Sequence, residues 1–89
     1  MDETQVFNTA IKVYGDITQE QVAIEECREL IQAICNKYRG RKHNIAEEIA
    51  DVEIMLEQLK IINNCHNDVE TIKRQKISRL FNRLFDKCL

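Results

Sequence analysis

Proline and tryptophan are absent from this 89-residue chain, and glycine occurs only at Gly15 and Gly40. A chain without proline has no residue that must interrupt a helix, and two glycines leave few positions of unusual backbone freedom. Hydrophobic residues make up 44% and charged residues 31%, a balance that argues against an intrinsically disordered chain. The composition is typical of one small helical domain, and we take residues 1–89 as a single domain.

Several targeting and redox signals are also missing. The four cysteines form no CxxC pair and no metal-finger spacing, and the N-terminus MDETQVFN lacks the basic and apolar regions of a signal peptide. No apolar run approaches the length of a membrane span. We therefore expect a cytoplasmic protein with reduced cysteines. A net charge of −2 predicts no general affinity for nucleic acid polymers or membranes.

Hydrophobic periodicity predicts an all-α fold of four helices, with no strand alternation and no internal repeat. The first is expected over residues 3–14, and the second from a Thr18 cap to about residue 39, where Gly40 supplies a left-handed C-terminal position. The third is expected to open at Asn44, with Glu47 in the capping-box position, and to reach about residue 64. The fourth should cover residues 67 or 68 to about 87.

Acidic residues lie on apolar stripes of the second and third helices. In AIEECRELIQAI (residues 23–34), Glu26 and Glu29 share a stripe with Val22 and Ala33, beside an apolar face of Cys27, Leu30, Ile31 and Ile34. In NIAEEIADVEIML (residues 44–56), Glu48 and Asp51 share a stripe with Met55, Leu59 and Ile62, beside a row that we expect to be the core, Ile45, Ile49, Val52 and Leu56. Four carboxylates are therefore expected to point toward the interior edge of a helix pair.

Buried like charges repel one another and lose hydration, which costs several kcal/mol per ion unless something compensates. A divalent cation such as Mg²⁺ or Mn²⁺ compensates, because it prefers hard oxygen ligands. Each acidic pair alone is more simply a solvated helix face or a response to the helix macrodipole. The matching pairs on consecutive helices favour a metal site.

The two segments carry a recognisable double motif. EECRE, followed eighteen residues later by EIAD, resembles the EExxE…ExxD signature of the MazG-like all-α nucleoside triphosphate pyrophosphohydrolases, and the similarity extends over about residues 5–85. The resemblance implies a four-helix MazG-like bundle that hydrolyses a nucleoside triphosphate to the monophosphate and pyrophosphate with Mg²⁺. It implies metal ligation by Glu26, Glu29, Glu48 and Asp51, with Glu25 placed to orient or deprotonate the attacking water.

The resemblance also implies phosphate contacts from the last helix, for which Lys76 is the first candidate, Lys73 the second and Arg79 the third. The alternative is that these side chains keep their charged ends in water. Tyr14 is a candidate for stacking on the base, although a core tyrosine explains it as well. The basic loop of Arg39, Arg41, Lys42 and His43 could close over a triphosphate or simply be solvated.

A second apolar row on the third helix, Ala50, Ile54 and Ile61, lies nearly opposite the expected core row. A helix that is apolar on two sides is generally covered on two sides, so we expect a homodimer with this row and part of the fourth helix at the interface. A tetramer remains an alternative. Two other functions also remain open: a non-catalytic helical interaction protein, and a phosphoribosyl-ATP pyrophosphohydrolase.

Overall fold

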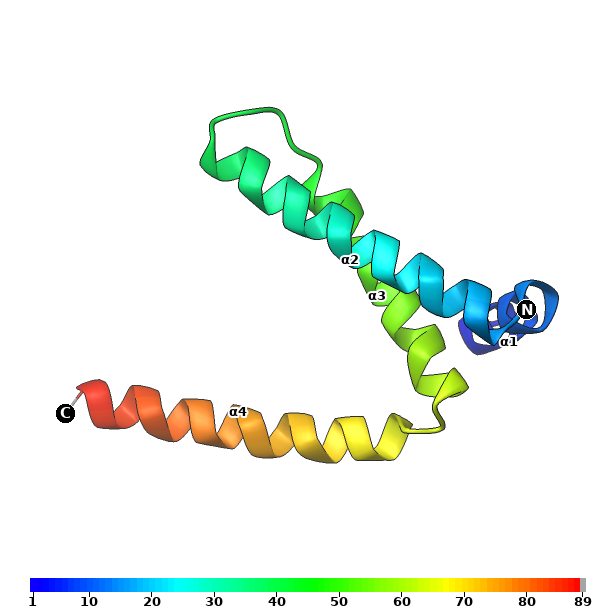
Figure 1. The fold of residues 1–89 in the computed structure, drawn as a ribbon. Coiled ribbons are helices and arrows are strands. Elements are labelled where there is room, and N and C mark those ends of the chain that lie inside the picture. The colour runs from blue at the N-terminus through cyan, green and yellow to red at the C-terminus, as the bar shows by residue number, and fades with distance from the viewer. Residues whose placement is uncertain (89) are drawn as a thin grey trace.

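The computed structural model describes the backbone of residues 1–88 and the side chains of residues 1–87. This part of the chain forms four α-helices and no strand: α1 (Glu3–Tyr14), α2 (Asp16–Tyr38), α3 (Ile45–Ile62) and α4 (His66–Cys88). Helices α2 and α3 lie side by side as an antiparallel pair, with α1 across one end and α4 extending away from the other helices (Figure 1). The all-α prediction is confirmed.

Local signals explain most helix ends. Asp2 caps α1 through a reciprocal capping box with Gln5, with both bonds at 2.8 Å. Gly15, at φ 92°, is the residue between α1 and α2 and forms the turn that joins them. The expected cap at Thr18 is therefore wrong, because α2 already begins at Asp16. Gly40 takes the left-handed conformation expected after α2, at φ 68°.

The seam between α2 and α3 holds the small core. Its buried apolar side chains are Ala23, Ala33 and Met55, and its buried polar side chains are Gln19, Glu48 and Gln58. The Gln19 Nε2 donates to the Gln58 Oε1 at 2.7 Å, which satisfies two amides that water cannot reach. The stripes that carry the predicted acids therefore form the centre of the helix pair.

The side chains that we expected to be the core lie mostly outside the seam. Ile31 is 61% exposed, and Ile34, Ile49 and Leu56 are each more than 40% exposed. The expected core assignment is corrected: these side chains occupy one outer side of the pair, because each helix is broadly apolar and only one edge of its apolar face meets the other helix.

Helix α4 contacts only α3 among the other helices of residues 1–88. The molecule measures 52 × 37 × 23 Å with a radius of gyration of 16.5 Å, whereas a compact domain of this length has a value of about 12 Å. The four helices of one chain do not close into the expected bundle.

At the N-terminal end of α4, the Lys60 Nζ lies 2.6 Å from Glu57 and 3.8 Å from Glu70.

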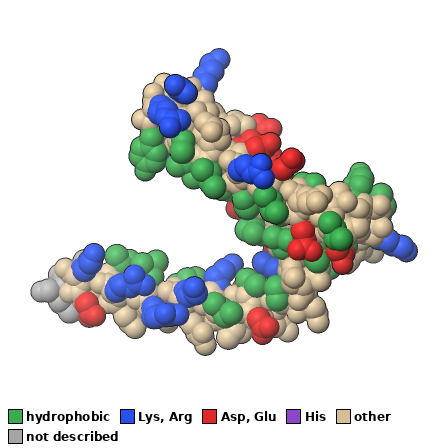
Figure 2. Space-filling model, viewed as in Figure 1, with side chains coloured by type: hydrophobic (Ala, Val, Ile, Leu, Met, Phe, Trp, Pro, Cys, Tyr) green, Lys and Arg blue, Asp and Glu red, His purple; other side chains and the backbone are tan. Residues whose placement is uncertain are grey.

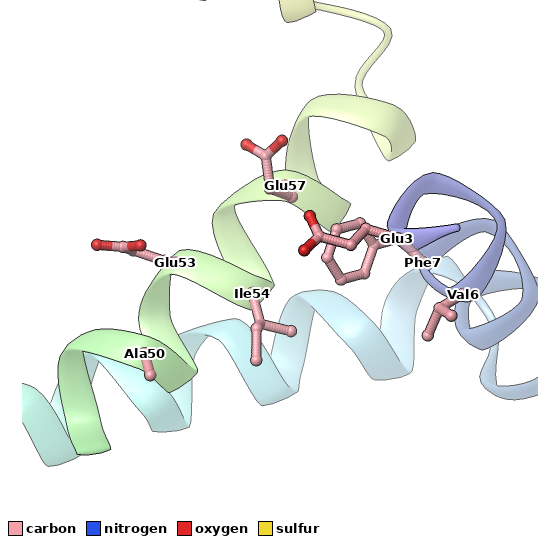
Figure 3. Close-up of a pocket in the computed structure, with 7 residues that line it drawn as sticks. All are labelled: Glu3, Val6, Phe7, Ala50, Glu53, Ile54 and Glu57. Carbon is pink, nitrogen blue, oxygen red and sulfur yellow. The ribbon is translucent and has the colours of Figure 1, made fainter. Parts of the chain in front are cut away.

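The second apolar row of α3 faces α1. Ala50 and Ile54 line a hollow of about 440 Å³ together with Val6 and Phe7, while Ile61 is half-buried nearby. The Phe7 ring extends from α1 toward α3, and the carboxylates of Glu53 and Glu57 extend outward from α3 (Figure 3). Helix α1 lies beside this row but does not cover it, because Ile54 is 44% exposed and Ala50 is exposed, and the expected interface at this row stays a prediction.

Two further expectations concern the cysteines and the membrane. Cys27, Cys35 and Cys65 are free thiols. Across the described helices, none combines the length and the apolar character that crossing a bilayer requires.

Candidate metal centre

The α2–α3 seam brings the predicted acids together. Carboxylate oxygens of Glu26, Glu29 and Glu48 all lie within 4.8 Å of one another. Glu26 and Glu29 are one helical turn apart on α2, and Glu48 comes from the first turn of α3, which runs in the opposite direction. Three of the four predicted ligands therefore form one cluster, which we call the carboxylate cluster.

Glu48 is the most enclosed member of the cluster, with 6% of its surface exposed. The Asn44 Nδ2 donates to its Oε1 at 2.7 Å, while its Oε2 is buried with no hydrogen-bond partner. The Glu26 Oε2 is likewise buried without a partner. Two orphaned carboxylate oxygens in one small region are unusual, because buried polar atoms are nearly always paired.

The electrostatics reflect this crowding. Burial raises the pKa of Glu26 above its ordinary value, and repulsion from Glu29, Asp51 and Glu48 raises it further. The pKa of Glu48 is also raised, first by burial and then by Glu29 and Asp51, although the hydrogen bond from Asn44 opposes the shift. Each proton added to the cluster removes repulsion, and a bound cation would do the same.

Asp51 and Glu25 occupy different positions relative to the cluster. Asp51 is half-buried on α3 and outside the group of three, although its charge contributes to the raised pKa of Glu26. Glu25 is exposed on α2 and outside the group of three. The structure thus brings together three of the four predicted metal ligands, whereas ligation by Asp51 and the role of Glu25 stay predictions.

The predicted phosphate and base contacts are not brought to the cluster within one chain. Lys73, Lys76 and Arg79 are exposed on α4, which does not contact α2, and Lys73 instead lies 3.8 Å from Glu70. Tyr14, at the end of α1, is 62% exposed and is not the core tyrosine of the alternative interpretation. The loop residues 39–44 are exposed as well. Basic side chains follow α4 along its length (Figure 2).

The donor set fits a hard divalent cation. Glutamate and aspartate oxygens from facing helices are the ligand type that Mg²⁺ and Mn²⁺ prefer, and the two orphaned oxygens supply donors that no protein group uses. No histidine or cysteine belongs to the cluster, so the set does not favour zinc. The residues present therefore fit the metal that the resemblance implies.

Sequence reasoning missed two features of the site. Asn44 was expected to cap α3, yet its side chain makes no capping bond and instead holds Glu48, four residues on. The i, i+4 spacing of an amide and a carboxylate is the signal that could have revealed this contact. The buried Gln19–Gln58 pair gave no such signal, because the two residues are 39 positions apart.

No protein-family model, curated protein or solved structure matches the chain. The resemblance to the MazG-like enzymes consequently depends on the two acidic motifs, their spacing and the surrounding sequence.

Proposed function

We propose that the chain is a Mg²⁺-dependent nucleoside triphosphate pyrophosphohydrolase that releases the nucleoside monophosphate and pyrophosphate. The observation that supports this proposal is the carboxylate cluster, in which Glu26 and Glu48 each bury an oxygen with no partner. Such a cluster destabilises a metal-free fold, and a catalytic need for the cation explains why the sequence retains it. The motif resemblance supplies the reaction type.

In this proposal Glu26, Glu29, Glu48 and Asp51 hold the cation. When bound, Mg²⁺ neutralises phosphate oxygens and lowers the pKa of a coordinated water. Asn44 orients Glu48 by donating to one of its oxygens and so leaves the other free for ligation. Glu25, exposed beside the cluster, is available to accept a proton from the attacking water.

A substrate panel tests the proposal directly. Purified protein is incubated with ribo- and deoxynucleoside triphosphates and with phosphoribosyl-ATP, and pyrophosphate release is measured with Mg²⁺, with Mn²⁺ and with chelator. We expect metal-dependent release from at least one nucleoside triphosphate. Release from phosphoribosyl-ATP alone would indicate a phosphoribosyl-ATP pyrophosphohydrolase instead. No pyrophosphate release from any substrate would contradict both enzymatic functions.

Two ligand substitutions test the site. Glu29→Gln and Asp51→Asn each remove one metal ligand with little change in shape, and we expect turnover to fall by about two orders of magnitude or more. Glu20→Gln on the same helix is the matched control, because Glu20 is exposed and lies outside the cluster. Near-full activity in either ligand variant would show that the assignment is wrong.

A non-catalytic helical interaction protein is the second candidate. It is favoured by the large exposed apolar side chains of α2 and α4, which include Ile24, Ile31, Phe81 and Phe85. The two candidates differ in their response to the cation: the enzyme should gain thermal stability when Mg²⁺ or Mn²⁺ is added, and the interaction protein should not.

A further inference from the structure

The hollow between α1 and α3, which we call the α1–α3 hollow, has a volume of about 440 Å³, within the range of small-molecule sites. Its apolar lining comes from Val6 and Phe7 on α1 and from Ala50 and Ile54 on α3. Helix α1 does not close it, since Val6 is 48% and Ile54 44% exposed. A molecule in this hollow would therefore bury apolar surface that the chain leaves open to water.

The Phe7 ring is the largest apolar group in the α1–α3 hollow. It is half-buried and extends from α1 toward α3 (Figure 3). Phe7 and Glu57 also line a neighbouring hollow of about 300 Å³, which continues along α3 to Ile61. An aromatic ring in this position offers apolar contact area and, through its face, an attraction for cations.

The other side chains that line the α1–α3 hollow are all acidic: Glu3, Glu53 and Glu57. Glu57 accepts a hydrogen bond from Lys60, which holds the pKa of Glu57 below its ordinary value. Among the described residues, Glu3 and Glu53 form no ion pair. Glu3 extends from α1 in the direction of the Phe7 ring (Figure 3). The charge of these two carboxylates is therefore available to a bound cation.

The hollow over α2 provides a comparison within the same molecule. Its volume is about 490 Å³, and its apolar lining includes Ile24, Ile31 and Leu59. Its charged lining residues are one acid, Glu20, and one base, Arg28, so opposite charges balance there. The α1–α3 hollow is lined by acids without a base, which gives it an electrostatic preference that the hollow over α2 lacks.

The α1–α3 hollow is also separate from the proposed metal centre. None of its lining residues belongs to the carboxylate cluster. At about 100° per residue, Glu53 points about 140° away from Glu48 around α3. The acids that line the hollow would repel a phosphate group, so the nucleotide proposed as substrate is not the ligand for which this hollow is suited.

We propose that the α1–α3 hollow binds a small organic cation, in which one ammonium group carries an aromatic or branched aliphatic body. The apolar body contacts Phe7 and Ile54, and the ammonium group donates to the carboxylates of Glu3 and Glu53. A neutral compound of the same shape gains the apolar contact alone, and an anion is repelled. The proposal is independent of pyrophosphate release, because the two sites share no residue.

A two-dimensional ¹⁵N–¹H NMR titration with 2-phenylethylammonium chloride, in buffer with chelator, tests the proposal. We expect saturable shifts of the amides of α1 and of residues 50–57. The affinity should exceed that for 2-phenylethanol, which has the same shape and no charge, by about tenfold. Phenylacetate should bind more weakly than the alcohol. Larger shifts at residues 26–29 would place the amine at the carboxylate cluster and would overturn the proposal.

Charge-removing variants test the selection of the cation. Glu53→Gln keeps the shape of the side chain, and it should lower the affinity for the amine by about threefold. Together with Glu3→Gln the loss should reach about tenfold, while the affinity for 2-phenylethanol stays unchanged. Glu20→Gln is the matched control, because Glu20 is an exposed acid that lines the hollow over α2 instead. An equal loss for the amine and the alcohol would overturn the proposal, because charge would then not select the ligand.

Two other occupants of the α1–α3 hollow would give different results. A second copy placed on Ala50 and Ile54 would shift the amides of residues 50–57 when the protein alone is concentrated, and it would compete with the amine. A basic protein helix would be indicated if a synthetic amphipathic helix of leucine and lysine bound here and the amine did not. Either result, or phenylacetate binding as strongly as the amine, would overturn the proposal.

Discussion

At Glu48 the two carboxylate oxygens have different surroundings. One accepts a hydrogen bond from Asn44, and the other is buried with no partner beside Glu26 and Glu29. Desolvation and repulsion both act against the charged form, which is why the pKa of Glu48 is raised. The same residue is thus unfavourable for the metal-free fold and suited to holding a cation.

Glu48→Gln tests this double role. Without metal, the variant should unfold at a temperature a few degrees above the wild type, because one repulsive charge is removed. The stabilisation by Mg²⁺ should be lost in the variant, because a ligand is gone. Differential scanning calorimetry with chelator and with Mg²⁺ measures both effects, and Glu47→Gln is the control because Glu47 is exposed beside it. A destabilised metal-free variant would contradict the argument.

The pH dependence of stability follows from the same residues. The folded-state pKa values of Glu26 and Glu48 lie above the ordinary value of 4.5, so the folded state binds protons more tightly than the unfolded state between 4.5 and the raised values. The free energy of unfolding of metal-free protein should therefore increase as pH falls from 7 toward 5. The lowered pKa of Glu57 acts in the opposite direction, but only below 4.5.

Urea denaturation at several pH values, with chelator present, measures this dependence. The change of the unfolding free energy with pH should become smaller in Glu48→Gln, because one of the two titrating carboxyl groups is gone. It should vanish in saturating Mg²⁺, because ligation keeps the carboxylates charged. A stability that declines steadily from pH 7 to pH 5 in the wild type would show that the cluster is solvated.

At the level of the helices, the α2–α3 seam contains little apolar volume, and its alignment depends on a polar contact. The buried Gln19 donates to Gln58, whose Nε2 lies 3.6 Å from the Met55 Sδ. A buried amide pair favours one register of two helices, since sliding would leave both amides unpaired. That register also sets Glu26 and Glu29 opposite Glu48.

Gln58→Ala should lower the free energy of unfolding by about 2 kcal/mol, because it leaves the Gln19 amide buried and unpaired. The double variant Gln19→Leu, Gln58→Leu should recover most of the loss but weaken Mg²⁺ binding, since apolar contacts do not fix the register. Gln32→Ala breaks an exposed amide contact with Asn36 and is the control. Unfolding by urea measures the stability, and a Mg²⁺ titration measures the affinity for the cation. A Mg²⁺ affinity in the double variant equal to that of the wild type would show that Gln19 and Gln58 do not position the carboxylate cluster.

The sequence predicted the number, type and approximate limits of the helices, because periodicity and glycine positions are local signals. Of the four acids expected to converge, Glu26, Glu29 and Glu48 lie together, and the matching arrangement of acids on the two stripes was the signal for this. It did not predict which edge of each apolar face forms the seam: Ile31 and Leu56 have ordinary core chemistry and are exposed, whereas Gln19 and Gln58 are polar and buried. Long-range pairing decides that choice, and periodicity within one helix carries no information about it.

At the scale of the whole molecule, the exposed surface and the small core have the same origin. Within residues 1–88, α4 contacts no helix other than α3, and its large apolar side chains Ile77, Leu80, Phe81, Leu84 and Phe85 are each at least half exposed. A chain of this length is marginally stable even when fully compact. The stability of the fold is therefore expected to depend on association.

Concentration-dependent unfolding checks that expectation. For a dimer that unfolds to separate chains, each tenfold rise in protein concentration increases the apparent stability by about 1.4 kcal/mol, so the urea midpoint should rise with concentration. Asn82→Glu should behave like the wild type, whereas Phe81→Glu should unfold at a lower midpoint that does not change with concentration. A wild-type urea midpoint that is constant over a hundredfold range of protein concentration would show that each chain folds alone, because the stability of a dimer that unfolds to separate chains depends on concentration.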